Sequence, residues 1–430
     1  MSTNRTGKPR ILQVHNFYQQ AGGEDAVVAA EYRLLTEHGH YVARYTVHND
    51  GINNLSGPVV ALKTLWNRDT TKEIKASIAR HAPDLIHAHN TLPLVSPALY
   101  YAAAELGVPV VQTLHNYRLL CPAAILYREG KICEDCLHTT PLTGILHACY
   151  RNSRPATAAV ASMLMIHRAL GTWRERVHTY IALTEFGKAK FTEGGIPAGK
   201  IVVKPNFLSG DPGVGAGDGG YALFAGRLAP EKGIETLLDA WRKLKRPVPL
   251  KIAGDGAFLQ QARRRAVDLP DVQVLGACSH EEVLRLIKEA SVLVFPSEWY
   301  EGLPMVVIEA FACGTPVIAS DLPSMDEFVS AGVNGARFKT GSPDNLARCV
   351  DRMFGDREAL EHMRVSARVS YERRFTADRN YPQLLSIYRG ATGQPQQLEE
   401  TSLPAAGRES KSAESQSSDL KALLYGTRTQ

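Results

Sequence analysis

Short apolar runs alternate with helix-period stretches along the first half of the chain. In AVVAAEYRLLTEHG at 26–39, apolar residues recur every three or four positions, which predicts an amphipathic helix. Strands separated by helices are typical of a parallel sheet with crossover helices, so we expect a first α/β lobe. The runs that predict its buried strands lie at 11–15, 41–47, 84–89, 108–114, 180–183 and 201–205.

A second series of the same kind begins after Gly220. Within it, Ser279 followed three residues later by Glu282 forms a capping-box pattern that predicts the start of a helix. At 430 residues the chain is long enough for two lobes of about 150–200 residues each and a tail. The strands predicted for the second lobe lie at 221–226, 249–254, 272–276, 292–297 and 315–320.

The glycine-rich run SGDPGVGAGDGG at 209–220 separates the two series. We predict that it forms a flexible hinge, too polar to pack into either core, between a lobe at 1–208 and a lobe at 221–374. The run contains G-x-G-x-x-G from Gly215 to Gly220. Because it precedes a strand, whereas a dinucleotide-binding fingerprint follows one, this match does not predict a cofactor site.

Composition narrows the class of protein. An apolar fraction of 44% and a charged fraction of 22% are close to globular averages, which excludes a fibrous or wholly disordered chain. From 394 onward, Gln, Ser, Glu, Ala and Gly dominate, and this predicts a disordered tail at 394–430. No apolar run is long enough to cross a bilayer, and MSTNRTGKPR lacks the apolar core of a signal peptide, so we expect a cytoplasmic protein.

Net charge and cysteine usage exclude further classes. A net charge of +5, without any basic and aromatic module of the usual kinds, argues against nucleic-acid binding. Seven cysteines, an odd number, in a chain without an export signal predict reduced thiols in place of a disulfide framework.

The segment at 292–320 carries the most informative chemistry. Glu301 lies in a loop after a buried strand, and Glu309 lies eight residues later in the next helix. Both can face the carboxyl ends of the strands, where open α/β sheets bind ligands, and the amides of Gly302 and Leu303 add donors there. A carboxylate can accept from two neighbouring hydroxyls, which makes Glu309 a candidate ribose ligand. A solvated helix start is the alternative, but the apolar neighbours of Glu309 argue against it.

Two cations flank the loop in FAGRLAPEKGIETLL at 224–238. Arg227 follows the end of a predicted strand, and Lys232 lies five residues later, before an amphipathic helix. A guanidinium fork and an ammonium at the mouth of a parallel sheet suit a diphosphate. Such a pair is more often a solvated surface feature, and its position in the same lobe as Glu309 favours the functional interpretation.

GRLAPEKG and the later run EGLPMVVIEAFACGTPVIA together resemble the retaining GT-B glycosyltransferases of family four, also called glycosyl transferases group one. The resemblance covers roughly residues 10–390. It implies two Rossmann-like parallel-sheet lobes that face each other across a cleft. The N-terminal lobe would form the acceptor side, the C-terminal lobe would bind the nucleotide sugar, and a helix at 375–393 would return to the N-terminal lobe.

The resemblance also implies roles for individual residues. Arg227 and Lys232 would hold the donor diphosphate, Glu309 the ribose, and Glu301 the transferred sugar. His115 in QTLHNY would lie near that sugar. The other donor-site residues implied are Gly22, Gly23, Glu185 and Asn206, of which Asn206 has a turn residue as its alternative.

The implied activity is transfer of a sugar, with its anomeric configuration retained, from UDP- or GDP-sugar to a glycan or lipid-linked acceptor. The catalytic residues would be His115, Glu301, Arg227 and Lys232, and no catalytic metal would be required. Two alternatives remain: a GT-B-fold sugar-nucleotide epimerase, and a non-catalytic protein that binds sugar nucleotides.

Cysteine and histidine clusters raise the question of metal binding. Four of the seven cysteines have the spacing C-x11-C-x2-C-x12-C. This spacing is compatible with two interpretations, a structural zinc site and a group of free or redox-active thiols. His87 and His89 lie two residues apart in a predicted strand, and core packing or cleft lining is favoured over a metal site. The four clustered cysteines are Cys121, Cys133, Cys136 and Cys149.

One stretch has the composition of a membrane-surface helix. Residues 157–180 combine apolar side chains with His167, Arg168, Arg174 and Arg176, which suits reversible contact with anionic lipid at the inner face of the membrane. The alternative is an ordinary helix packed on the core of its lobe.

Overall fold

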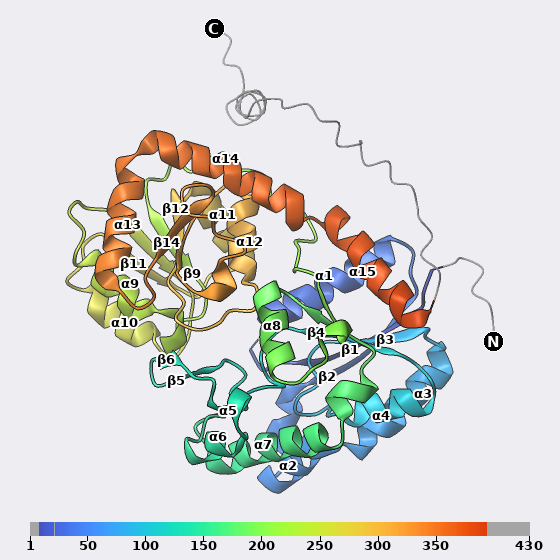
Figure 1. Cartoon of the computed structure of the whole chain (residues 1–430). Helices are drawn as coiled ribbons and strands as arrows, with labels where there is room; N and C mark the ends of the chain where they lie inside the picture. Colours follow the sequence, from blue (N-terminus) through green and yellow to red (C-terminus); the bar gives the residue numbers. More distant parts are fainter. Residues whose placement is uncertain (1–7, 21, 394–430) are drawn as a thin grey trace.

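The computed structural model describes residues 8–20 and 22–393, which form two lobes, each built around a six-stranded parallel sheet (Figure 1). All eleven predicted strands are present, most of them within about two residues of the predicted limits. The predicted α/β class with two Rossmann-like lobes is therefore confirmed. The predicted tail at 394–430 lies outside the described residues.

The N-terminal sheet has the strand order β2-β1-β3-β4-β7-β8, with every neighbouring pair parallel. Its strands are β1 (Ile11–Phe17), β2 (Val42–His48), β3 (Leu85–Ala88), β4 (Val110–Leu114), β7 (Thr179–Ala182) and β8 (Ile201–Val203). Its main helices are α1 (Gly23–Glu37), α2 (Gly57–Leu65), α3 (Arg68–His81), α4 (Ala98–Glu105), α7 (Arg154–Ala169) and α8 (Glu185–Glu193).

The C-terminal sheet has the order β11-β10-β9-β12-β13-β14, again parallel throughout. Its strands are β9 (Ala222–Ala225), β10 (Leu250–Ala253), β11 (Val272–Gly276), β12 (Val292–Phe295), β13 (Val317–Ser320) and β14 (Gly335–Phe338). Its helices are α9 (Ile234–Trp241), α10 (Leu259–Ala266), α11 (His280–Glu289), α12 (Met305–Ala312), α13 (Pro343–Gly355) and α14 (Arg357–Arg374).

These strand orders place a topological switch point in each sheet. In the N-terminal sheet it lies between β1 and β3, and in the C-terminal sheet between β9 and β12, because the chain leaves these neighbouring strands in opposite directions. Ligands of open α/β sheets bind in the crevice that such a switch creates. The loops after β1, β9 and β12 are therefore the ones that the fold directs to a site.

Local sequence explains where helix α11 begins. Ser279 occupies the N-cap, and its hydroxyl accepts a hydrogen bond from the backbone N–H of Glu282 at 3.2 Å. This bond satisfies one of the amides that a helix start leaves without an intrahelical partner. The predicted helix start is therefore confirmed.

The C-terminal helix α15 (Ala377–Thr392) belongs structurally to the N-terminal lobe. After α14 the chain crosses back, and α15 lies beside α1 and over the N-terminal sheet (Figure 1). Leu384 and Tyr388 pack there against Ile11, Leu85 and Val111, and all five side chains are fully buried. The last described helix thus completes one face of the first lobe.

The glycine-rich run at 209–220 is not the unpacked hinge that we predicted from its composition. The amides of Gly215, Gly217 and Gly219 donate to the carbonyls of Cys313, Lys288 and Glu289. A Cβ on Gly215 would lie 2.2 Å from the Lys288 carbonyl oxygen. The glycines are needed because the run passes so close to the ends of α11 and α12, and the second half of the run is fixed to the C-terminal lobe.

An insert after β4 bridges the lobes on one side of the cleft. It contains β5 (Tyr127–Arg128), β6 (Lys131–Ile132), α5 (Asp135–His138) and α6 (Leu142–Leu146), which sequence patterns did not predict. The Tyr127 hydroxyl donates to Oε2 of Glu298 in the other lobe at 3.4 Å. Of the eight non-glycine residues with positive φ in the described ranges, six lie between 124 and 152, a concentration of unfavourable backbone that needs firm support.

Helix α7 buries part of its apolar side chains and exposes the rest. Its apolar residues Val160, Met163 and Leu164 are buried against α2 and α6, whereas Ile166 and Leu170 are exposed. Within residues 8–20 and 22–393, no helix combines the length and the hydropathy needed to span a bilayer.

Candidate active site

A cavity of about 300 Å³ opens between the two switch points, a size at the lower end of the range for small-molecule sites. Both lobes contribute to its walls. The N-terminal lobe provides Gly23, Glu24, His115, Asn116, Leu183 and Asn206, and the C-terminal lobe provides Gly226, Lys232, Ser297, Trp299, Glu301, Gly302, Leu303, Pro304 and Met305 among others.

Glu301 and Lys232 form the charged centre of the C-terminal wall. The Lys232 Nζ donates to Oε1 of Glu301 at 2.7 Å, and the Trp299 Nε1–H donates to the same oxygen at 2.8 Å. The Ser297 hydroxyl is a third donor to Oε1. Glu301 is only 6% exposed, so these donors fix its orientation. Among the described residues no donor is recorded for its Oε2, which leaves that oxygen for a ligand.

His115 faces this pair from the end of β4 in the other lobe. Its Nε2 lies 3.0 Å from Nδ1 of His89, and burial lowers its pKa to about 3, so the ring is neutral at pH 7. A Cβ on Gly302 would lie 2.9 Å from the His115 carbonyl oxygen. Glycine at 302 therefore allows the lobes to touch beside the cavity, and His115 and Glu301 line the same space.

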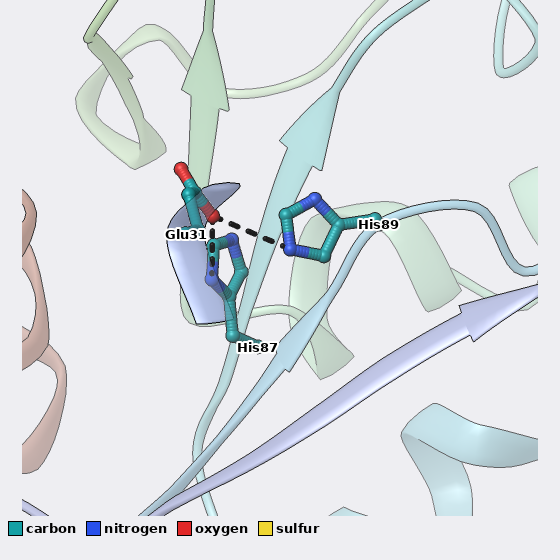
Figure 2. Close-up of side chains that lie close together, drawn as sticks. All are labelled: Glu31, His87 and His89. Carbon is teal, nitrogen blue, oxygen red and sulfur yellow. Dashed lines mark ion pairs between the residues drawn. The ribbon is translucent and has the colours of Figure 1, made fainter. Parts of the chain in front are cut away.

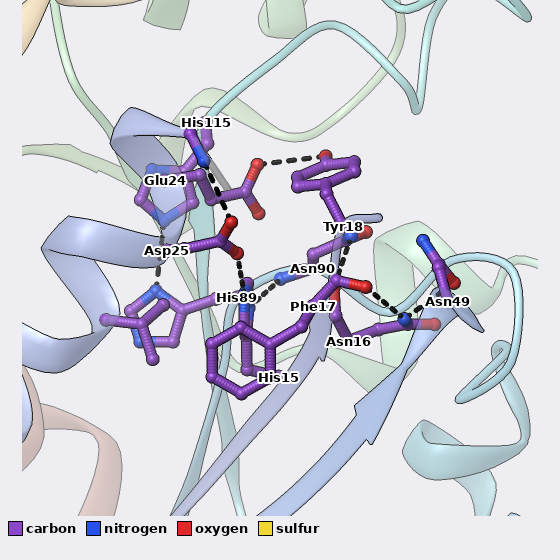
Figure 3. A network of polar contacts seen from close by, with 12 residues as sticks. His15, Asn16, Phe17, Tyr18, Glu24, Asp25, Asn49, His89, Asn90 and His115 are labelled. Carbon is purple, nitrogen blue, oxygen red and sulfur yellow. Dashed lines mark hydrogen bonds and ion pairs between the residues drawn. The ribbon is translucent and has the colours of Figure 1, made fainter. Parts of the chain in front are cut away.

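Asp25 and His15 hold the start of α1 in place (Figure 3). Asp25 accepts a hydrogen bond from the Gly22 N–H at 3.0 Å, and its other oxygen lies 2.7 Å from Nε2 of the buried His15. Gly23 lines the cavity, and a Cβ there would lie 3.3 Å from the Met305 side chain. The predicted glycine pair thus brings backbone close to the second lobe, although only Gly23 lines the cavity itself.

Glu24 is a cleft residue that sequence analysis did not single out. It accepts a hydrogen bond from the Tyr18 hydroxyl at 3.0 Å (Figure 3). It accepts a second one from the Asn116 amide at 3.4 Å. Burial raises its pKa to about 8, so the side chain is mostly protonated at pH 7. Glu24 follows directly after Gly23 in the first turn of α1, where the chain passes from strand β1 into the helix. A titratable residue at such a turn is the sequence signal that could have identified Glu24 as a cleft residue.

Asn206 is buried and lines the cavity. Its amide donates to the Leu303 carbonyl oxygen at 3.4 Å, a long contact between the lobes, and its Oδ1 has no partner within the described residues. Glu185 does not reach the cavity, because it is exposed at the start of α8. The neighbouring Phe186 N–H donates instead to Glu327 of the other lobe at 2.9 Å.

Arg227 and Glu309 lie outside this cavity. The Arg227 side chain is about half exposed at the mouth and pairs with Glu231 at 2.5 Å. Glu309 is buried one turn after Met305 along α12, where it lines a second hollow of about 280 Å³ with His280 and the start of the 209–220 run. Burial raises its pKa. The donor-site residues predicted for the C-terminal lobe are thus not all in one pocket. Lys232 and Glu301 line the first cavity, Glu309 lines the second, and Arg227 lies outside both.

Glu31, His87 and His89 form a buried group behind the cleft wall (Figure 2). Glu31 Oε2 lies 3.5 Å from His87 Nδ1 and 3.4 Å from His89 Nε2, while its Oε1 accepts from the Lys204 Nζ at 3.0 Å. The predicted assignment of both histidines to core packing or cleft lining agrees with their complete burial.

The four clustered cysteines all lie in the insert. Gly144 joins three parts of it: its carbonyl accepts from the Cys149 N–H at 3.0 Å, and its Cβ position lies 3.7 Å from the Cys136 sulfur and 3.2 Å from Pro122. Burial, and then the neighbouring cysteines, raise the pKa of Cys136 to about 12. Across the described residues, no three of these sulfurs come within 4.8 Å of one another, and none of the cysteines is in a disulfide.

Two Rossmann-like lobes that contact each other around a cleft define the GT-B class of glycosyltransferase fold. Residues 18–206 match the family described as glycosyl transferase 4-like domain, and residues 214–370 match glycosyl transferases group 1. The two matched regions meet at the linker and together span most of the chain. The protein belongs to the group 1 glycosyltransferases.

Individual relatives are distant. An uncharacterized glycosyltransferase of Methanocaldococcus jannaschii is 32% identical over 33% of this chain, a match that spans 40% of that protein. The alpha-D-kanosaminyltransferase of Streptomyces kanamyceticus is 25% identical over 79% of this chain and 85% of that enzyme. The crystal structure of HepE from Anabaena, in complex with UDP and glucose, has a TM-score of 0.63 at 19% identity, covering 89% of this chain and all of that one. At this identity the structural likeness shows the fold alone.

Proposed function

We propose that this protein transfers a sugar from a nucleoside diphosphate carrier to a glycan or lipid-linked acceptor, with the anomeric configuration retained. The observation that carries the proposal is the cavity in which Lys232 and Glu301 of one lobe face His115 of the other. Lys232 supplies positive charge for a diphosphate, Glu301 keeps one carboxylate oxygen for sugar hydroxyls, and His115 supplies a neutral ring nitrogen.

The donor would extend along α12 from the cavity to Glu309. Met305 and Glu309 are four residues apart on α12, about 6 Å along the helix axis, which is a short distance on the scale of a nucleotide. With the sugar beside Glu301 and the phosphates between Lys232 and Arg227, the ribose would reach Glu309. The exposed Arg227 would turn from Glu231 toward the phosphates, which costs little because surface ion pairs are weak.

UDP is the carrier that we propose first, with GDP as the second choice. The support is that HepE, which shares the fold, was crystallised in complex with UDP and glucose. A thermal-shift panel of UDP- and GDP-sugars tests the choice. A donor at a hundred times its dissociation constant stabilises the folded state by about 2.7 kcal/mol, and a panel without any shift would contradict the proposed function.

The proposed chemistry needs no protein nucleophile. The bond between C1 of the sugar and the diphosphate oxygen breaks, with its electron pair leaving on the diphosphate, and the acceptor oxygen bonds to C1 on the same face. The acceptor proton passes to the leaving diphosphate. Lys232 and Arg227 stabilise the charge that develops on the leaving group, which is electrostatic catalysis. Glu24 is mostly protonated at pH 7, and Glu301 is held by three donors on Oε1 while the proposal assigns its Oε2 to sugar hydroxyls, so neither carboxyl is given the role of nucleophile.

Two experiments separate this activity from its rivals. Incubation with the donor alone would release an epimerised sugar nucleotide if the protein were an epimerase. A non-catalytic binder would show a thermal shift but no turnover with any acceptor. For the transferase, the anomeric proton coupling of the product should match that of the donor, and an inverted linkage would exclude retention.

A membrane surface is the proposed setting for the acceptor. Three adjoining helices, α2, α6 and α7, carry exposed apolar side chains, and the exposed cations Arg151 and Arg154 lie at the start of α7. Apolar side chains with flanking cations suit an anionic lipid surface. The exposed apolar residues are Val59, Leu62, Trp66, Leu142, Leu146, Ile166 and Leu170.

We also propose that the insert binds one structural zinc ion through Cys121, Cys133, Cys136 and Cys149. The cysteines lie close enough to perturb one another electrostatically, and Arg128 beside Cys133 and Cys149 would offset the negative charge of zinc-bound thiolates. Such a site would supply the support that the six positive-φ residues of the insert require.

A further inference from the structure

A row of buried polar groups leads from the side of α15 to the active-site cleft. Lys204 Nζ lies 3.0 Å from Glu31 Oε1. Glu31 Oε2 lies 3.4 Å from His89 Nε2 (Figure 2), and His89 Nδ1 lies 3.0 Å from His115 Nε2 (Figure 3). Lys204, Glu31 and His89 are each at most 2% exposed. Buried polar groups are costly unless each has a partner, so the order of these contacts constrains where the protons lie.

The row is not arranged for a metal ion, although Glu31, His87 and His89 bring three donor atoms together. The Lys204 ammonium already occupies Oε1 of Glu31. His87 uses Nε2 toward the Thr113 hydroxyl at 2.8 Å and Nδ1 toward the Tyr388 hydroxyl at 2.7 Å. Because Lys204 binds the carboxylate and both ring nitrogens of His87 contact hydroxyls, these three residues do not offer a free set of metal ligands.

Charge states along the row follow from burial and from Lys204. Burial alone would raise the pKa of Glu31, but the charge and the hydrogen bond of Lys204 act in the other direction and the net shift of the pKa is downward, so the carboxylate is ionised at pH 7. Burial lowers the pKa of His89 well below its usual value and that of His115 to about 3. Each histidine is therefore neutral and carries one N–H, and the hydrogen-bond partners decide which nitrogen holds it.

The ionised Glu31 determines the first proton position. Its Oε2 is buried and accepts no hydrogen bond within the described residues, and Nε2 of His89 likewise makes none. These two atoms face each other at 3.4 Å, and a lone pair on Nε2 would be repelled by the carboxylate, whereas an N–H would be attracted. His89 therefore holds its proton on Nε2, and its Nδ1 is an acceptor.

The second proton position follows from the first. Because His89 Nδ1 accepts, the 3.0 Å contact requires His115 to donate from Nε2. The neutral His115 ring then has no proton on Nδ1. His115 lines the cavity, and no partner for Nδ1 is recorded among the described residues, so Nδ1 is the nitrogen available to a ligand.

We propose that Glu31, acting through His89, holds His115 in the tautomer protonated on Nε2, so that a lone pair on Nδ1 faces the cleft as a hydrogen-bond acceptor. Glu31 and His89 are positioning residues, because neither lines the cavity. The role that we give to this tautomer rests on the proposed function. The acceptor nitrogen would bind a hydroxyl of the donor sugar, and the neutral ring adds no further positive charge beside Lys232.

The tautomer can be measured directly on the full-length protein without any ligand. Two-bond proton–nitrogen correlation spectra of protein labelled with 15N-histidine distinguish protonated from unprotonated ring nitrogens, and a His115→Gln variant assigns the His115 signals. At pH 7 we expect the tautomer with the proton on Nε2 in at least about tenfold excess, the ratio that one net hydrogen bond supports. A proton on Nδ1, or a doubly protonated ring, overturns the proposal.

A matched pair of variants tests the role of His89. His89→Phe keeps an aromatic ring but removes the acceptor, so His115 should become a mixture of both tautomers. His87→Phe replaces an equally buried histidine two residues earlier, whose ring makes hydrogen bonds with Thr113 and Tyr388 and none with His115, and it should leave the His115 signals unchanged. An unchanged tautomer in a folded His89→Phe variant overturns the role of His89. If either variant does not fold, the wild-type spectrum still decides the tautomer.

Failure of this inference is distinguishable from failure of the proposed function. The spectra are recorded without donor, so the tautomer stands or falls independently of nucleotide-sugar binding. The thermal-shift panel tests the donor without reference to the tautomer. If donors bind but His115 carries its proton on Nδ1, only the inference is wrong.

Discussion

At the scale of single residues, Glu309 is the most direct test of how the donor lies. It is a buried carboxyl on α12, one turn beyond the cavity. A neutral amide cannot accept protons from both ribose hydroxyls and loses a charge-assisted bond worth about 1.5–3 kcal/mol. We therefore expect Glu309→Gln to weaken nucleotide-sugar binding roughly 10- to 150-fold in calorimetry.

The matched control for this experiment is Glu185→Gln. Glu185 is exposed at the start of α8 and does not line the cavity, so its replacement should leave donor affinity unchanged. Equal affinity of a folded Glu309→Gln variant and the wild type would remove Glu309 from the ribose site. A loss of affinity in Glu185→Gln would mean that donor binding moves α8 toward the cleft.

Glu24 gives a prediction about pH. Its pKa is raised by burial from the ordinary 4.5 to about 8 in the folded protein. Between about pH 4.5 and 8 the folded state therefore holds a proton that the unfolded state has lost, so this group's contribution to stability declines as the pH rises through that window. Glu24→Gln has no such loss, and its melting temperature relative to the wild type should rise between pH 5 and pH 9.

Glu37→Gln on the same helix serves as the control, because Glu37 is exposed and its replacement should shift the melting temperature equally at both pH values. If the difference between Glu24→Gln and the wild type is the same at pH 5 and pH 9, Glu24 titrates as an ordinary surface glutamate.

At the scale of elements, the 209–220 run shows how a glycine-rich segment can be fixed. A Cβ on Gly215 would lie 2.2 Å from the Lys288 carbonyl oxygen, so Gly215→Ala must displace backbone. We expect a loss of about 1–3 kcal/mol in the free energy of unfolding, measured by urea titration. Gly210→Ala is the control, since no atom lies within 4 Å of the new Cβ. Equal stability of the two variants would show that the run is loosely attached.

The insert yields a prediction about metal content. We expect protein purified without chelator to carry one zinc ion per chain in elemental analysis. Cys133→Ser and Cys136→Ser should lose the metal, because each removes one of four ligands. Cys349→Ser is the control, since Cys349 lies in α13 of the other lobe and should leave the content unchanged. Wild-type protein without stoichiometric metal would leave the four residues as ordinary thiols.

Sequence patterns predicted the elements that bury continuous apolar runs, and they failed where packing between distant segments decides the structure. The β12 run VLVF is fully buried and was predicted, whereas β14 at Gly335–Phe338 includes the charged Arg337 at the sheet edge and was missed. We interpreted the glycine content of 209–220 as a sign of flexibility, although glycines also allow a backbone segment to pack closely against another one. Only the structure shows which of the two applies.

The same distinction holds for the candidate site. Lys232, Glu301 and His115 follow strand ends, so their gathering at the cleft was predictable from the α/β pattern. Ser297 and Trp299, which fix Glu301, carry no pattern of their own. Glu31 could not have been found either, because it lies in the middle of α1 and meets His89 and Lys204 only through the arrangement of the sheet.

At the scale of the whole molecule, the exposed apolar side chains on α2, α6 and α7 predict a preferred orientation at a membrane. Leu62 and Leu146 are each 71% exposed and Leu170 is 58% exposed. Replacing all three with serine removes the apolar contact that adds to the attraction of anionic lipid. We expect the triple variant to lose most of its sedimentation with anionic vesicles while it keeps its melting temperature.

Val267→Ser is the control for that experiment, because Val267 is 80% exposed but lies at the end of α10 in the other lobe. Its replacement should not change vesicle binding. Wild-type protein that sediments equally with anionic and neutral vesicles, or a triple variant that binds as the wild type does, would contradict membrane contact through this face.

The position of α15 has a consequence for biosynthesis. The ribosome releases the strands of the first lobe early, yet the helix that covers Ile11, Leu85 and Val111 is translated more than 170 residues after β8. The second lobe is continuous in sequence and can fold as a unit while the first still exposes one sheet face and the buried Lys204. The first lobe therefore starts to form first during translation, but it can complete its fold only after the second lobe. During that interval the open sheet face needs protection from aggregation, and ribosome-stalled chains ending before residue 377 should be more sensitive to protease in the first lobe than in the second.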